Sequence, residues 1–385
     1  MVDRRRRRTV GYFTSWGVYG SADRPRYTAR DARISGTAAR LDHLVYCFAN
    51  ISAGLRVVLG DPWADAEMPF PAVDSVDGVA DDPGQPLRGN LNQLRKLKVA
   101  YPRLRISVAI GGPHWSGRFP QAATAKSRDE FISSAIDLFL RGNVPGLPVG
   151  AAAGIFDGID LDWEFPQAAD EANLAALVAE FRCRLDLLTA ESGRRFLLTA
   201  WVPAAEELAA HWDRTQLGDF DFVVVQGYDL HGPWESTTNF ASALSSDAPN
   251  RTWFTCDRAV AAWRAKRART RNLLLGIPFY CHGWTEVEPG RSGDGLWQPG
   301  VGIGDPPTYR GLRSVPGQMH RRSGMGAWKY DPAGKRFFSV DDTAVMAEKA
   351  AWVATRGLGG VAAWELGGDT PDGELLAALR SGLSV

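Results

Sequence analysis

The sequence predicts an α/β fold, a (β/α)8 TIM barrel with a small α+β insertion between the seventh strand and the seventh helix. Short apolar segments alternate with amphipathic segments along the chain, which is typical of βα units that build a parallel sheet. Eight such strands in 385 residues favour closure into one barrel. The expected strands cover residues 10–15, 43–49, 105–110, 154–162, 196–202, 222–228, 273–278 and 360–364.

Capping residues mark the boundaries of several helices. Ser127, followed three residues later by a glutamate, has the spacing of a capping box. Asp170 opens a second helix, whose apolar stripe closes at Gly193. Asp342 opens a third helix, which ends at Gly357. Each of these helices follows an expected strand, as the barrel requires.

One connection is too long for an ordinary loop. Residues 283–340 separate the seventh strand from the next helix and are rich in glycine, proline and aromatic residues. A structureless loop of that size is rare in a compact domain, so we expect a small α+β insertion subdomain that walls one side of the barrel mouth. The barrel then comprises residues 9–282 and 341–385. Residues 1–8 form a basic N-terminal tail.

The composition narrows the classes of partner. The 44 basic and 44 acidic residues give a formal net charge of zero, so no nucleic-acid partner is expected. No segment approaches a membrane span, so no membrane partner is expected either. The four cysteines lie far apart without CxxC spacing, and the six histidines have no ligand spacing, so we expect no metal and no cofactor. Cys183 falls on the apolar side of a predicted helix, and we expect it to be buried.

Four acidic residues fall within the eight positions 157–164, in an otherwise apolar segment. In an extended strand Asp160, Asp162 and Glu164 point one way, while the apolar residues from Ile159 to Phe165 point the other. Crowded carboxylates raise at least one pKa, which suits an enzyme that needs a protonated carboxylic acid near neutral pH. A calcium site fits poorly because calcium loops spread their ligands around a bend.

The position of these acids in the expected fold supports catalysis. Asp162 and Glu164 fall at the end of the fourth strand, and catalytic residues of (β/α)8 barrels lie at the carboxyl ends of strands. Asp157 has the wrong parity for the inward face, so we favour a structural role for it. The sequence therefore predicts an acid-dependent enzyme with Asp162 and Glu164 at the barrel mouth.

The acidic segment resembles the D-x-x-D-x-D-x-E motif of family 18 glycoside hydrolases, the chitinase family. Gly158, Trp163 and Pro166 agree with the motif as well. The insertion after Tyr280 is similar to that of bacterial chitinases with an inserted α+β domain. Further segments resemble the family's other strands in order, from residue 10 to nearly the C-terminus: 11–17, 44–49, 111–112, 226–232, 276–280 and 359–365.

The resemblance implies catalytic roles for four residues. Glu164 is the general acid that protonates the glycosidic oxygen and then the base that activates water. Asp162 holds the acetamido N–H of the substrate and stabilises an oxazolinium intermediate, while Asp160 shares a proton with Asp162. Tyr228 donates to the acetamido group. The family retains configuration by substrate assistance, and Asp162 lies beside the acid, about 7 Å along the same strand face, where a separate nucleophile is not expected.

The resemblance and the aromatic content predict the substrate-binding residues. Sugar rings stack on flat apolar faces, so tryptophans in loops are candidates for the cleft, whereas Trp212, Trp253, Trp263 and Trp352 lie in or beside helices and fit a core. Trp63, Trp115, Trp234 and Trp297 lie in loops that can line a cleft. The expected substrate-binding set is Tyr12, Phe48, Trp115, Asp229, Tyr280, His282, Trp297 and Trp364.

Four departures from the family pattern affect details of the site. Ala109 replaces a serine that supports Asp160, and Pro113 stands where a tryptophan is usual. Cys281 and His282 replace Gly-Arg, which exchanges a fixed cation for a titrating group. A glutamine replaces the usual methionine at position 226. None of these changes affects the acid itself, so we expect altered subsite affinity or pH optimum and retained activity.

The resemblance implies a chitinase that hydrolyses β-1,4 linkages between N-acetylglucosamine units, with chitin or chito-oligosaccharides as its partners. An endo-β-N-acetylglucosaminidase acting on N-glycans or peptidoglycan is the alternative enzyme, and a non-catalytic chitin-binding lectin is the alternative from another class. We expect a monomer. An extracellular location is expected from the substrate, but residues 9–22 lack the leucine-dense core of an export signal, so a cytoplasmic location stays open.

Overall fold

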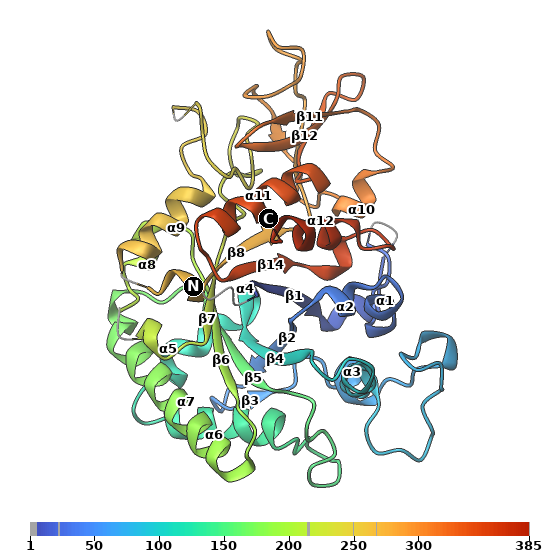
Figure 1. The fold of residues 1–385 in the computed structure, drawn as a ribbon, viewed down its shortest axis with the longest axis vertical. Coiled ribbons are helices and arrows are strands. Elements are labelled where there is room, and N and C mark those ends of the chain that lie inside the picture. Colours follow the sequence, from blue (N-terminus) through green and yellow to red (C-terminus); the bar gives the residue numbers. More distant parts are fainter. Residues whose placement is uncertain (1–5, 22–23, 214–215, 249, 267, 385) are drawn as a thin grey trace.

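The computed structural model describes residues 6–21, 24–213, 216–248, 250–266 and 268–384. Eight parallel strands close into a barrel surrounded by helices, which confirms the predicted fold class (Figure 1). Neighbouring strands pair in the order β1-β14-β8-β7-β6-β5-β4-β2, and β2 pairs back with β1. These strands are β1 (Arg8–Thr14), β2 (His43–Ile51), β4 (Arg105–Gly111), β5 (Gly158–Asp162), β6 (Leu197–Val202), β7 (Phe222–Val225), β8 (Leu273–Pro278) and β14 (Gly360–Trp364).

Two apolar layers hold the barrel together. Side chains that point inward from the strands form a cluster that includes Tyr12, Cys47 and Trp201. Side chains that point outward, such as Leu161, pack against the helices in a larger core. Consecutive residues of a strand alternate between the two layers because successive side chains leave a strand on opposite faces. Polar residues that occupy inward positions are therefore enclosed by the barrel.

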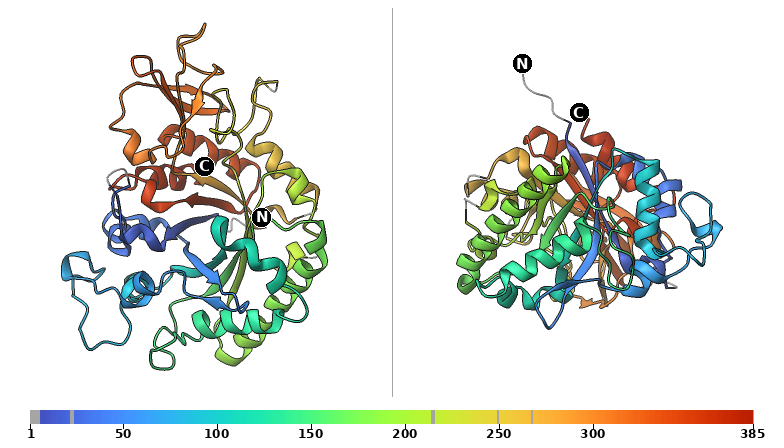
Figure 2. Two further views of the ribbon diagram at one scale, coloured as in Figure 1. Left: turned by 180° about the vertical axis from the view of Figure 1, so that it is seen from behind. Right: turned by 90° about the horizontal axis from the view of Figure 1, so that it is seen from below.

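The helices form an outer ring, and β1 begins on the face of the barrel where α12 ends (Figure 2, right). The side chain of Arg380 in α12 reaches Thr9 at the start of β1 with an Nη1–Oγ1 distance of 3.0 Å. The helices are α1 (Ala29–Ile34), α2 (Thr37–Arg40), α3 (Gly89–Ala100), α4 (Gly112–Trp115), α5 (Phe119–Ala122), α6 (Arg128–Ala135), α7 (Glu171–Ser192), α8 (Glu206–Ala209), α9 (Cys256–Ala265), α11 (Thr343–Thr355) and α12 (Glu374–Gly382).

All three helices begin directly after the predicted residue, but only Asp342 caps its helix with its side chain. The carboxylate of Asp342 accepts hydrogen bonds from the backbone N–H groups of residues 344 and 345 at the start of α11. α7 follows Asp170 and ends at Gly193, whose φ of 69° is the left-handed conformation that glycine favours. Ser127 precedes α6, but its backbone is already helical and its side chain caps no N–H group. The capping box expected there is wrong.

A second sheet lies between β8 and α11. Five antiparallel strands pair in the order β10-β9-β13-β12-β11 and project beyond the barrel at the top of Figure 1. Their core includes Trp284, Trp328 and Phe337. The strands are β9 (His282–Thr285), β10 (Val301–Gly302), β11 (Gln318–Arg322), β12 (Gly326–Asp331) and β13 (Arg336–Ser339), and the short helix α10 (Tyr309–Leu312) lies between β10 and β11.

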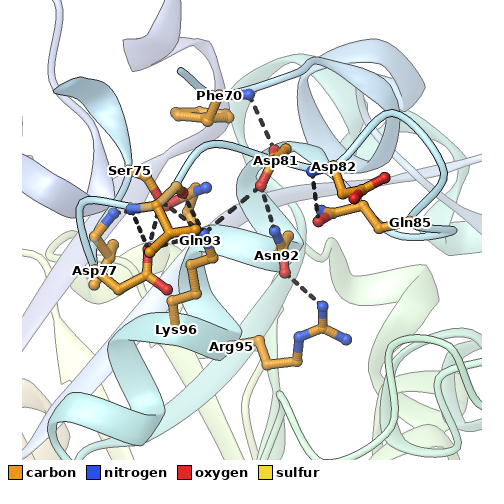
Figure 3. Close-up of polar contacts among 12 residues, drawn as sticks. Phe70, Ser75, Asp77, Asp81, Asp82, Gln85, Asn92, Gln93, Arg95 and Lys96 are labelled. Carbon is orange, nitrogen blue, oxygen red and sulfur yellow. Dashed lines mark hydrogen bonds and ion pairs between the residues drawn. The ribbon is translucent and has the colours of Figure 1, made fainter. Parts of the chain in front are cut away.

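A long segment between β3 (Val57–Val58) and α3 is tied to that helix by polar contacts (Figure 3). The ammonium group of Lys96 donates hydrogen bonds to the Ser75 hydroxyl, the Asp77 carboxylate and the Val79 carbonyl, at 2.7–2.9 Å. Asp81 accepts one hydrogen bond from a backbone N–H and another from a side-chain amide. Both carboxylates therefore have donors, which hold a segment with little regular structure in place.

Two expectations about burial are wrong. Cys183 is exposed, because the buried stripe of α7 runs through Leu177, Phe181 and Leu185 and leaves position 183 outside. Trp253 is 55% exposed, whereas Trp212 and Trp263 are buried as expected. Within the described residues, no helix is both long and apolar enough to cross a membrane. The same part of the chain contains no group of three or more His, Cys, Asp or Glu residues suited to hold a metal ion.

Candidate active site

Three carboxyl groups gather where β5 reaches the mouth of the barrel. Asp160 and Asp162 point inward from the strand and are buried. Glu164 follows two residues after the end of the strand and is half-buried. The expected alternation holds up to this residue. It fails at Phe165, which packs against the inward cluster and contacts the Trp201 ring at a centroid distance of 5.8 Å.

Asp160 is held by hydroxyl groups from two neighbouring parts of the barrel. Thr199, its register partner on β6, donates a hydrogen bond to Oδ1, and Tyr12 on β1 donates to Oδ2 at 3.4 Å. Burial raises the pKa of Asp160 to about 6, although these two hydrogen bonds oppose the rise. Ala109 is the register partner on β4 and supplies no hydroxyl. Thr199 thus supplies from β6 the kind of support that β4 lacks.

Asp162 and Glu164 are electrostatically coupled. Burial, then the charges of Glu164 and Asp160, raise the pKa of Asp162 well above its ordinary value. Burial and the charge of Asp229 raise the pKa of Glu164 to about 7, although its hydrogen bond with Asp162 opposes the rise. The Oδ1 atom of Asp162 is buried and has no hydrogen-bond partner among the described residues. A substrate N–H group can satisfy this acceptor, and Glu164 can carry a proton near neutral pH.

Asp229 forms the opposite side of the site. Its φ of 55° places it in the left-handed conformation just after β7. Its Oδ1 atom accepts a hydrogen bond from the Tyr280 hydroxyl and lies 2.7 Å from Nε2 of His282. Tyr228, the preceding residue, accepts a hydrogen bond from Nε1 of Trp201 at 2.8 Å. The structure thus joins Tyr280 and His282 to the Asp229 carboxylate, and the Tyr228 ring lies 6.0 Å from the Tyr280 ring.

Aromatic rings pack against one another at the barrel mouth, with Tyr12 and Phe48 buried and Trp16, Trp115 and Trp364 partly exposed. Trp364 at the end of β14 is half-buried, and its ring lies 5.5 Å from the Tyr12 ring and 5.6 Å from the Phe48 ring. The Phe48 ring stacks in turn on Trp16, which is 41% exposed. Trp115 packs against the same inward cluster. The exposed parts of the three tryptophans match the apolar faces of sugar rings.

Two residues lie apart from this group. The Trp297 ring lies between the guanidinium groups of Arg251 and Arg322, 5.0 Å from each, and packs against the core of the second sheet. The structure does not bring it to the carboxyl groups. Asp157 lies before β5 begins, at the other end of the strand, and pairs with Lys98 at 2.5 Å. Two arginines also contact its carboxylate, which agrees with a structural role.

Sequence reasoning missed three residues that contact the site. Thr199 bonds Asp160, Trp201 bonds Tyr228, and Ser116 contacts the backbone around Glu164. Register across β5 and β6 could have identified Thr199, because it lies opposite Asp160. Ser116 lies in a loop, where no periodicity indicates a direction for its side chain.

The family model of glycosyl hydrolases family 18 matches residues 8–369. The chain belongs to this family. It is similar to Chitinase 63 of Streptomyces plicatus, with 34% identity over 384 residues, which cover 97% of this chain and 60% of the relative. Chitinase C of Streptomyces lividans is 34% identical over 375 residues, covering 95% of this chain and 58% of that protein. The chain thus spans about three-fifths of the length of these curated relatives.

A solved structure of the same family resembles the whole chain. The catalytic domain of psychrophilic chitinase B from Arthrobacter TAD20 superposes with a TM-score of 0.90 and is 35% identical in sequence. The match covers 98% of this chain and 95% of that domain. The family 18 resemblance inferred from the acidic motif is confirmed by these matches.

Proposed function

We propose that this chain is a chitinase that hydrolyses β-1,4 linkages between N-acetylglucosamine units. The observation that carries the proposal is Glu164, a half-buried carboxyl group with a pKa of about 7, beside the buried acceptor of Asp162 and near the aromatic surface around Trp364. A carboxylic acid that is partly protonated at neutral pH can donate a proton to a leaving oxygen. The family membership and the names of the relatives support the substrate class.

The proposed mechanism uses the substrate as its own nucleophile. Glu164 donates its proton to the glycosidic oxygen while the acetamido oxygen of the sugar forms a bond to the anomeric carbon, which breaks the glycosidic bond. Asp162 accepts the acetamido N–H and stabilises the positive oxazolinium that results. The Glu164 carboxylate then takes a proton from water, and the water oxygen opens the oxazolinium at the anomeric carbon. Two inversions give retention of configuration.

The surrounding residues have supporting roles in this proposal. Asp160 shares a proton with Asp162, and burial keeps the pKa of both carboxyl groups high. Tyr228 donates a hydrogen bond from its hydroxyl group to the acetamido group. Burial raises the pKa of this tyrosine well above its ordinary value, so the hydroxyl stays protonated. Asp229 contacts the sugar at the cleavage site, and Trp364 stacks below the distorted ring.

The roles that we propose for the other substrate-binding residues follow from where these residues lie in the structure. Tyr280 and His282 orient Asp229, which contacts the sugar at the cleavage site. Phe48 and Trp115 line the barrel mouth next to Trp364, and Tyr12 acts from below through Asp160. Chitin lies outside cells, so we propose an extracellular enzyme, and we propose that it acts as a monomer.

Replacing Glu164 by Gln tests the proposal. The variant should lose turnover of N-acetylglucosamine oligomers by more than about 10³-fold while it still binds them, because the amide cannot donate the proton. Glu207→Gln, an exposed residue on α8, is the matched control and should keep wild-type turnover. Residual turnover of the Glu164 variant above a few per cent would refute the assignment.

Product analysis separates the alternatives. The first product should be the β-anomer by proton NMR, and an initial α-anomer would exclude substrate assistance. Faster cleavage of a high-mannose glycopeptide than of chitin oligomers would favour the endo-β-N-acetylglucosaminidase. Binding of oligomers without cleavage by the wild-type chain would indicate a lectin.

A further inference from the structure

Ser116 contacts the two peptide units that flank residue 163, the residue before Glu164. Ser116 is buried at the start of a single 3-10 turn, Ser116–Arg118, which follows α4. Its Oγ atom accepts a hydrogen bond from the backbone N–H of Glu164 at 3.0 Å. The hydroxyl proton is directed to two carbonyl oxygens, that of Asp162 at 2.7 Å and that of Gly112 at 2.8 Å. One side chain thus joins the loop after β4 to the backbone after β5.

These backbone groups lie at or beyond the end of the β4–β5 ladder, where the neighbouring strand supplies no further hydrogen-bond partner. The β4–β5 ladder ends at the register pair of Gly111 and Asp162, and β5 ends there as well. A buried backbone N–H or C=O beyond the end of a ladder needs another partner. Ser116 supplies a partner for the Asp162 carbonyl and for the Glu164 N–H at once.

The loop is shaped to bring the serine this close. Gly111 has a φ of 104°, which only glycine adopts readily, and a Cβ atom at this position would lie 2.4 Å from the Asp162 carbonyl oxygen. The backbones of β4 and β5 therefore approach more closely here than a side chain at position 111 would allow. The Gly111-Gly112 pair places Ser116 against the acidic segment.

We propose that Ser116 is a positioning residue that sets the direction of the Glu164 side chain by fixing the backbone from Asp162 to Glu164. The inference rests on the proposed function, because it assigns the serine to the same catalytic acid. Glu164 projects from a backbone outside any strand, so its Cα–Cβ bond follows the orientation of its own peptide unit. A small rotation of that unit moves the carboxyl group away from Asp162 and toward solvent.

The loss of the hydroxyl should therefore change catalysis in a way that simple loss of stability does not. Ser116→Ala should lower kcat on N-acetylglucosamine oligomers by about 10²-fold, the cost of a displacement of about 1 Å at a reacting group, with a smaller change in KM. The alkaline limb of the kcat/KM profile should also move to lower pH. Burial is the main cause of the raised pKa of Glu164, and a carboxyl group that turns toward water loses that effect.

The chain offers a matched control at Ser134. Ser134 is also a buried serine, and its hydroxyl accepts from the Val57 N–H at 2.9 Å and donates to the Phe131 carbonyl at 2.8 Å. Ser134→Ala removes a comparable set of backbone hydrogen bonds away from the site. It should cost similar stability to urea and leave kcat and the pH profile unchanged. Ser116→Thr, which keeps the hydroxyl, should recover part of the activity and the wild-type alkaline limb.

The outcomes separate this proposal from the proposed function. If Ser116→Ala matches Ser134→Ala in kcat and pH profile, the positioning role is refuted while Glu164→Gln still tests the function. If both alanine variants lose activity in proportion to their lost stability, Ser116 is only a structural residue and the proposal fails. If the wild-type chain cleaves no oligomer, the proposed function itself fails. Should Ser116→Ala not fold, the Ser116→Cys and Ser134→Cys pair carries the same comparison, because a thiol is a weak hydrogen-bond donor and acceptor. Identical kcat values and pH profiles for these two variants would overturn the proposal.

Discussion

Two segments of this chain carry four acidic residues each, and most of their carboxyl groups lie in contrasting electrostatic environments, although Asp157 in the second segment pairs with cations. Residues 74–82 form part of the long segment before α3, and residues 157–164 enter and leave β5. In the first segment, Asp74 pairs with Arg26 at 2.5 Å and Asp77 with Lys96 at 2.9 Å. In the second, burial raises the pKa of Asp160, Asp162 and Glu164, and hydroxyl groups and neighbouring carboxyl groups surround them.

The comparison teaches that the number of acids in a sequence does not predict their chemistry. Burial acts to raise the pKa of Asp77, but hydrogen bonds from Lys96, a backbone N–H and Ser75 outweigh it, and the pKa is lowered. The inward face of the barrel offers Asp160 hydroxyl donors, and they do not offset its burial. Acids that lie next to cations stabilise structure, whereas acids enclosed without cations keep protons that a reaction can use.

The largest expected effect comes from removing the charge of Asp162, one of the acidic residues that the barrel encloses. Asp162→Asn should lower kcat on N-acetylglucosamine oligomers by about 10²–10³-fold, because the amide cannot stabilise a positive intermediate. Asp77→Asn makes the same chemical change in the paired segment and should leave kcat unchanged. Steady-state kinetics of both variants checks the comparison, which fails if the two lose similar activity.

A second test uses the dependence of stability on pH. The pKa of Asp160 is about 6 in the folded chain, raised from 3.8, so its contribution to stability is complete below 3.8 and is lost as pH rises through about 6. Asn resembles the protonated form. The unfolding free energy of Asp160→Asn relative to wild type should therefore increase by roughly 2 kcal/mol from pH 4 to pH 7, because each pKa unit corresponds to about 1.4 kcal/mol and part of the effect is already lost at pH 4. Urea unfolding measures this difference, and a difference independent of pH would contradict the raised pKa.

Lys96→Met tests residues 74–82 alone, the segment in which carboxylates pair with cations. The change leaves Ser75, Asp77 and the Val79 carbonyl without their shared donor and should destabilise the chain by about 2 kcal/mol. Activity per folded molecule should stay at the wild-type level, since the segment holds no reacting group. Lys335→Met is the control, because its pair with Glu288 is exposed on both sides and an exposed pair contributes little. Equal urea midpoints for both variants would show that the half-buried Lys96 contacts add nothing.

The smallest expected effect comes from removing the negative charge of Asp229, which acts on the pKa of Glu164. Asp229→Asn removes a negative charge that raises the pKa of Glu164, second only to burial. The alkaline limb of the kcat/KM profile should move to lower pH by less than about one pH unit, in addition to any loss of rate. The Asp77→Asn profile should overlay that of wild type. If the alkaline limb of Asp229→Asn stays where it is in wild type, the charge of Asp229 does not raise the pKa of Glu164.

The barrel could be predicted well because its strands and helices obey simple periodicities. All eight expected strands occur, and the alternation from Asp160 to Asp162 is as expected because a strand fixes which face each residue occupies. The prediction fails for Phe165, since β5 ends at Asp162 and alternation has no meaning in the turn that follows. Ser127 fails as a cap for a similar reason, because its backbone is already helical.

Site residues could be predicted only where a strand or a motif placed them. Asp162, Glu164 and Asp229 belong to motifs, and the structure brings them together. Residue type alone predicts Trp297, and residue type does not reveal that two arginines lie over its ring. Ser116 escaped because its contacts depend on the path of a loop whose direction is set by the φ of Gly111.

The contact between Thr199 and Asp160 has a consequence for how such enzymes change over evolutionary time. In a closed barrel every inward position borders a position on each adjacent strand, so Asp160 has one neighbour at residue 109 and another at residue 199. Either neighbour can contribute a hydroxyl. A lineage can therefore lose the hydroxyl from one strand and gain it on the other without abandoning the aspartate. Searches that require a serine at the first position would overlook descendants that made this exchange.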